Sequence, residues 1–275
     1  MKKTKIWLGV GVAVIAGAAP AAKAGDDLSG STALTQAVPF VLAQNQGQGG
    51  ENESGEGGVD AAAADKDPVK YGIALQVIAA HYYAGLAAYE AGETAAGTQL
   101  FAHGHAEVYA EMEEVFKKRG IADLGAKIEA AIAAANKKAP PAEVKQRVND
   151  VYAALAAAEQ AGPKSPLSPL AVKAQVIADM LDRAAAQYVL TLKQDATLET
   201  YLDGLGFAIT ARAQAQTALP QLDKVNPAAA KAIRAALDIA GSAYPGIKQA
   251  KPPKAKTSQF LAAASAARIA TANLR

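Results

Sequence analysis

The sequence predicts an all-α protein made of two related four-helix units that follow a signal peptide and a disordered leader. Three observations support this prediction. Apolar and small residues recur at spacings of three and four, prolines preceded by capping residues punctuate the chain, and a segment of the first half recurs 99 residues later. Alanine, the strongest helix former, is abundant throughout the punctuated region.

Residues 1–24 are typical of a secretory signal peptide. Lys2, Lys3 and Lys5 precede a short apolar run at 6–19, and an A-x-A cleavage pattern ends at Ala24. A retained membrane anchor fits less well because the run is short and interrupted by glycines and a proline. The pattern is typical of bacteria, so we expect a periplasmic or secreted protein with no transmembrane segment in its mature chain.

The leader, residues 25–67, is rich in Gly, Gln, Asn, Ser and Glu, and it holds eight acidic residues and one lysine. It offers too little apolar surface to offset the entropy of ordering, so we expect disorder. Two roles are open for its acids: gathering cations, or keeping a tether soluble. Composition favours the tether.

Cleavage changes the charge of the protein. Removing Lys2, Lys3, Lys5 and Lys23 leaves 24 basic against 26 acidic residues, a net charge of −2. The sequence pI of about 8.6 is therefore no argument for nucleic-acid binding, and we expect none. The chain has no cysteine, which excludes disulfides, thiolate metal sites and cysteine catalysis.

Beyond the leader, Asp67, Ser168 and Asn226 each place a capping side chain directly before a proline at the first helical position. Further prolines mark breaks between helices. We predict helices near 68–91, 94–119, 121–137, 141–160, 169–192, 197–221, 227–243 and 257–273.

An internal repeat groups these helices. Residues 76–80 (QVIAA) recur as 175–179 (QVIAD), and Tyr89 matches Tyr188 at the same offset. We therefore expect two related helical units with these boundaries: 68–162 and 163–275.

All three histidines lie in the first predicted hairpin. His81 precedes the turn at Gly92 by eleven residues and His103 follows it by eleven, which puts both roughly 16 Å from the turn in an antiparallel pair. His105 and Glu107 lie within about one turn of that level, and Glu107 shares a helix face with His103. Three imidazoles and a carboxylate are thus predicted at one height.

We predict a metal site formed by His81, His103 and Glu107, with His105 as an alternate ligand. Imidazole and carboxylate ligands suit Zn²⁺, Cu²⁺ or iron. The competing interpretation is that these side chains are packed or face solvent, because the number of residues does not determine helix rotation. Tyrosines of the same hairpin, together with the histidines, are residue types that ligate haem. Haem is the weaker alternative, because tyrosines at helical spacing are more often part of the core.

Two short patterns carry a family resemblance. The glycine-rich acidic leader and the patterns His81-x3-Gly85-x3-Tyr89-x2-Gly92 and His103-x3-Glu107-x-Tyr109 resemble a group of secreted, all-helical proteobacterial proteins. Residues 200–207 (TYLDGLGF) resemble, more distantly, the helical periplasmic region of bacterial iron permeases. The resemblance implies accessory work in metal uptake, with a transporter or another envelope protein as partner.

The sequence thus leaves three function classes in order. The first is a non-enzymatic protein that handles a metal or another ligand in the periplasm. The second is a structural or partner-binding helical module of the cell envelope. An enzyme comes third, because acid–base catalysis needs positioned groups and only the histidine level supplies candidates.

Overall fold

A computed structural model describes residues 58–275 of the chain. The predicted signal peptide, residues 1–24, and residues 25–57 of the leader lie outside the described residues. Across 58–275 the chain forms helices joined by turns and no strand, which confirms the all-α prediction. None of the helices in this part of the chain combines the length and apolar character needed to span a membrane.

The helices begin and end close to the predicted positions. They are α1 (Ala61–Ala64), α2 (Pro68–Glu90), α3 (Thr94–His103), the π-helical turn η1 (Gly104–Tyr109), α4 (Ala110–Lys118), α5 (Leu124–Asn136), α6 (Pro141–Gln160), α7 (Pro169–Thr191), α8 (Leu198–Val225), α9 (Pro227–Ala243) and α10 (Thr257–Thr271).

The three predicted caps form as expected. Asp67 accepts hydrogen bonds from the backbone N–H groups of Val69 and Lys70, and Ser168 and Asn226 cap α7 and α9 in the same way. Each satisfies donors that the first turn of a helix leaves without an intrahelical partner. Local side-chain chemistry therefore explains where these helices start.

Two helices differ from the prediction. The expected helix at 94–119 is interrupted by η1, so α3, η1 and α4 follow one another without a loop. Helix α8 continues through Pro220 to Val225, four residues past its predicted end. Pro220 is exposed, so its ring and missing N–H disturb only a solvent-facing turn.

The end of the leader is ordered. We expected disorder up to Asp67, but Asp60 caps the short helix α1, and Val59, Ala61 and Ala64 pack on the core. Arg119 at the end of α4 donates to the backbone carbonyl of Asp65, which ties this segment to the first half. The four alanines at 61–64 form this helix, and the polar composition averaged over the whole leader did not reveal them.

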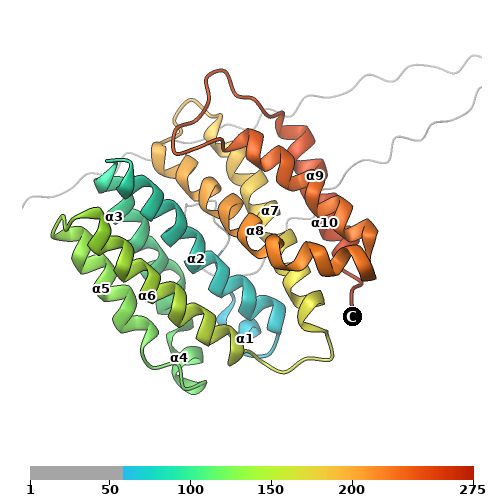
Figure 1. Cartoon of the computed structure of the whole chain (residues 1–275), viewed down its shortest axis with the longest axis horizontal. Helices are drawn as coiled ribbons and strands as arrows, with labels where there is room; N and C mark the ends of the chain where they lie inside the picture. Colours follow the sequence, from blue (N-terminus) through green and yellow to red (C-terminus); the bar gives the residue numbers. More distant parts are fainter. Residues whose placement is uncertain (1–57) are drawn as a thin grey trace, which may run out of the picture. The chain divides into compact units, whose positions relative to one another are not determined.

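Helix α2 is the centre of the described structure. It packs against α3, η1 and α6 of the first half and against α7 and α8 of the second (Figure 1). Fifteen of its 23 residues are buried, on every face of the helix. A helix without a polar face requires neighbours on all sides. Residues 73–80, which are apolar except for Gln76, are all buried by such neighbours.

The two halves share an order of neighbours. In the first half, α2 packs on α3 and α6, and α5 packs on the same two helices. In the second half, α7 packs on α8 and α10, and α9 packs on the same two helices. Within the described residues, both halves belong to one compact unit, and the connection at 161–168 contains the predicted boundary. This order agrees with a duplication, which stays a prediction.

Candidate functional site

Close approach of α2 and α3 sets the position of the predicted site. A Cβ atom on Gly97 would lie 2.5 Å from the backbone oxygen of Gly85, and one on Gly85 would lie 2.6 Å from the ring of Phe101. Gly92 makes the turn between the helices with a φ of +91°, a conformation that glycine adopts without strain. The glycines thus allow the two helices to pack backbone against backbone.

The π-helical turn η1 lies beside the middle of α2. At Gly104 a Cβ would lie 3.1 Å from the Cβ of His81 and 3.2 Å from the ring of Tyr82. The hydroxyl of Tyr82 donates to the carbonyl of Phe101, one turn before η1. Isolated π turns within α-helices are frequent at functional sites, because they change the direction of nearby side chains.

Four side chains meet at this level, and we call them the histidine–carboxylate cluster: His81, His103, Glu107 and Glu199. Nε2 of His81 lies 4.0 Å from Oε2 of Glu107, and Nδ1 of His103 lies 3.8 Å from Oε1 of Glu107. Nδ1 of His103 lies 2.9 Å from Oε1 of Glu199. The structure thus brings together three of the four predicted residues.

His81 is held by α2 itself. Its side chain is only 2 % exposed, and its Nδ1 lies 2.9 Å from the carbonyl oxygen of Val77, one helical turn earlier. Because a carbonyl oxygen can only accept, the proton of the neutral ring is on Nδ1. Nε2 is then the ring atom with a lone pair, and it is the atom nearest Glu107.

Glu199 joins the cluster from the second half of the chain and was not predicted. It lies in the first turn of α8, where a carboxylate is favoured by the helix dipole, and Thr197 caps that turn. Its second oxygen accepts a hydrogen bond of 2.8 Å from Gln99 on α3. No local pattern could show this contact, because 96 residues separate His103 from Glu199.

His105, the predicted alternate ligand, has a different environment. Its ring stacks on the ring of Tyr109, with centroids 5.4 Å apart and planes inclined by 23°. Tyr109 in turn stacks on Phe116. The π turn therefore directs His105 towards an aromatic row, although it lies only two residues from both His103 and Glu107.

The cluster is accessible on one side. The side chains of His103, Glu107 and Glu199 are 30, 36 and 29 % exposed, whereas His81 is enclosed. Across residues 58–275, no group of three or more histidine, aspartate or glutamate side chains already surrounds a point suited to a metal ion. The cluster is thus an open arrangement of two imidazoles and two carboxylates.

Fold and site together define an all-α protein with a histidine–carboxylate cluster at the junction of its two halves. A comparison with protein-family models, curated proteins and solved structures finds no match to this chain.

Proposed function

We propose that this protein binds a first-row transition-metal ion without catalysis, through His81, His103 and Glu107, with Glu199 as an additional ligand. One observation carries the proposal: the carboxylate of Glu107 lies between two imidazoles, 4.0 Å from one and 3.8 Å from the other. The second carboxylate lies 2.9 Å from His103. These donors are the kinds that Zn²⁺, Cu²⁺ and iron bind.

The separations support a shared ion. Metal–ligand bonds of 2.0–2.2 Å put two ligands of one ion about 3 to 3.5 Å apart. The pair of His103 and Glu199 already lies at such a distance, and the two gaps at Glu107 exceed it by less than about 1 Å. His103 and Glu107 are 30 and 36 % exposed, which leaves their side chains room to rotate towards a shared ion.

The hydrogen bond of His81 also favours a metal ligand. Ligating histidines usually donate their second ring N–H to a carbonyl or carboxylate, which holds the ring and its tautomer. Nδ1 of His81 and the carbonyl of Val77 form such a pair. In the neutral ring, Nε2 and the carboxylate of Glu107 both carry lone pairs, and a cation between them would be bound by both.

Haem stays the weaker alternative. Tyrosine binds haem iron as a phenolate, and burial raises the pKa of Tyr82 well above its usual range, which disfavours the phenolate at neutral pH. Tyr82 is also the tyrosine beside Gly104 and His81.

The test is calorimetric titration of tag-free protein with Zn²⁺, Cu²⁺ and iron, together with metal analysis of protein purified without an affinity tag. We expect His103→Ala and Glu107→Gln each to weaken binding by about tenfold to a hundredfold, and His81→Ala to abolish it. His105→Ala is the matched control, because it removes an imidazole from the same turn and leaves the cluster intact.

Two results would contradict the proposal. One is wild-type protein that binds none of these ions; the other is an equal loss of affinity in His105→Ala and His103→Ala. If no ion binds and His103→Ala lowers the melting temperature, the cluster acts as an ionic link between α3 and α8. The protein is then better described as a structural or partner-binding module of the cell envelope.

The proposed compartment is the periplasm or the cell exterior of a bacterium, where the protein would act as an accessory to metal uptake. The lysine-rich start, apolar run and cleavage pattern of residues 1–24 support it. Mass spectrometry of protein from the native cell should find Gly25 at the N-terminus. Retention of Met1 would contradict this part of the proposal.

A further inference from the structure

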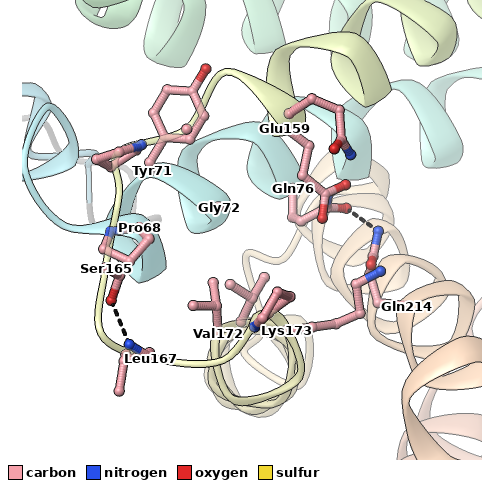
Figure 2. A pocket seen from close by; sticks show the side chains of 15 residues that line it. Pro68, Tyr71, Gly72, Gln76, Glu159, Ser165, Leu167, Val172, Lys173 and Gln214 are labelled. Atoms are coloured by element: carbon pink, nitrogen blue, oxygen red, sulfur yellow. Dashed lines mark hydrogen bonds between the residues drawn. The ribbon is translucent and has the colours of Figure 1, made fainter. Parts of the chain in front are cut away.

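A second candidate site lies in a pocket of about 400 Å³ where the two halves of the chain meet. Its walls come from the start of α2, the end of α6, the connection 161–168, the start of α7 and Gln214 of α8 (Figure 2). Its volume falls within the range of small-molecule sites, about 300–1,000 Å³. It shares no residue with the histidine–carboxylate cluster.

A pair of glutamines supplies polar groups at the wall of this pocket. Nε2 of Gln214 donates to Oε1 of Gln76 at 3.1 Å, which links α8 to α2 (Figure 2). Gln76 is a largely buried polar residue on α2. Since each amide has two donors and an acceptor, this bond leaves the Gln76 amide N–H groups and the Gln214 oxygen for a ligand.

One acidic and one basic side chain also line the pocket. Glu159 comes from the end of α6 and Lys173 from the first turns of α7. Neither forms an ion pair with a residue of the described part of the chain, although nine other lysine and arginine residues there do. Two opposite charges on different walls match a ligand that carries both an ammonium and a carboxylate group.

The rest of the lining is mainly apolar. Pro68 and Leu167 lie across the pocket from Glu159, Gln76 and Gln214, and Val172 lies beside Lys173 (Figure 2). Tyr71 presents its ring rather than its hydroxyl, because the hydroxyl donates to the carbonyl of Ala158 at 3.0 Å. The apolar surface suits aliphatic side chains and would orient a bound molecule.

We infer that this pocket binds a small zwitterion of the amino-acid or short-peptide class. Its ammonium group would pair with Glu159, its carboxylate with Lys173 and its amide groups with the Gln76–Gln214 pair. Aliphatic side chains would pack on Val172 and Leu167. The inference does not depend on metal binding, so either proposal can fail without the other.

The test is calorimetric titration of the full mature chain with valine, Val-Val and Val-Val-Val. N-acetyl-Val-Val lacks the ammonium group and Val-Val amide lacks the carboxylate. We expect at least one zwitterion to bind with a Kd below about 1 mM, and each capped dipeptide to bind about tenfold or more weakly. A bound peptide would contact both halves of the chain and raise the melting temperature.

Two variants assign the charges. Glu159→Gln should weaken binding of the zwitterion about tenfold and leave the weak binding of N-acetyl-Val-Val unchanged. Lys173→Met should likewise weaken binding of the zwitterion about tenfold and leave the weak binding of Val-Val amide unchanged. Glu143→Gln, on the same helix as Glu159, and Lys231→Met, on α9, are controls with the same change in charge. Both lie outside the pocket and should bind as the wild type does.

The inference is overturned if none of the three zwitterions binds at about 10 mM. It is equally overturned if capped and free dipeptides bind alike, or if Glu159→Gln and Lys173→Met bind the zwitterion as the controls do.

Discussion

Single glycines decide how closely the first hairpin packs. Gly97 lies against the backbone of α2, and no side chain can move aside to make room for a methyl group there, because the nearest atom is the carbonyl oxygen of Gly85. Glycine costs a helix about 1 kcal/mol relative to alanine. Its presence in the middle of α3 is therefore explained by the contact and not by helix propensity.

We expect Gly97→Ala to lower the free energy of unfolding by about 1–3 kcal/mol, because overpacking outweighs the gain in helix propensity. Urea unfolding followed by circular dichroism measures the change. Gly246→Ala is the control, since no atom lies within 4 Å of the added methyl group, and it should change stability by less than about 0.5 kcal/mol. An equal effect of both substitutions would argue against the close contact.

At the scale of elements, the short helix α1 is held by the end of α4. Nζ of Lys118 lies 2.5 Å from Oδ2 of Asp65, and Nη2 of Arg119 lies 3.0 Å from Oδ1. Arg119 also donates to the carbonyl of Ala161 at the end of α6, and its guanidinium lies 5.2 Å from the centre of the Tyr71 ring. One arginine thus joins α1, α2, α4 and α6.

The hydrogen bond from Lys118 lowers the pKa of the Asp65 carboxyl, and Arg119 lowers it further. A lowered pKa in the folded state adds stability above the unfolded pKa of about 3.9, and this stability is lost as the pH falls through the folded value. We therefore expect Asp65→Asn to be less stable than the wild type at pH 7, with a difference that disappears towards acid pH.

Thermal unfolding between about pH 2 and pH 7 measures the effect of Asp65→Asn across this window. The control is Asp195→Asn, an exposed aspartate in the connection between α7 and α8. It should follow the wild type at every pH. A difference at Asp65 that persists unchanged at the acid end would show that charge is not its cause.

At the scale of the whole molecule, tyrosines are a shared feature of both halves. All nine lie in the described residues, and burial raises the pKa of eight of them. The pKa of Tyr71 and of Tyr201 is raised to about 12. Several of the hydroxyls donate to backbone carbonyls of other helices or loops, as Tyr244 does to Ala184. Protonated tyrosine is therefore part of the folded state.

We expect the protein to keep its stability up to about pH 10 and to lose it steadily between about pH 10 and pH 12. The sign follows from linkage: in this window the unfolded chain has released protons that the folded chain still holds. Absorbance of tyrosinate, recorded during a pH titration with and without urea, measures both states. If the tyrosines of the native protein lost their protons at the same pH as those of the unfolded protein, the result would contradict this expectation.

Several features could be predicted from the sequence because they depend on neighbouring residues. Asp67, Ser168 and Asn226 determine where three helices start, since a cap acts within one turn. The common height of His81, His103 and Glu107 followed from counting residues from Gly92, because the rise per residue of a helix is constant. The all-α class, the helix order and three members of the cluster could be predicted in this way.

Rotation, and contacts between distant segments, were decided only by the tertiary structure. The turn η1 separates His105 from Glu107 although both lie within one turn, because packing of Gly104 against α2 sets the rotation. Glu199 reaches His103, and Gln214 reaches Gln76, across 96 and 138 residues. Such pairs depend on how the two halves pack, and no local spacing records that packing.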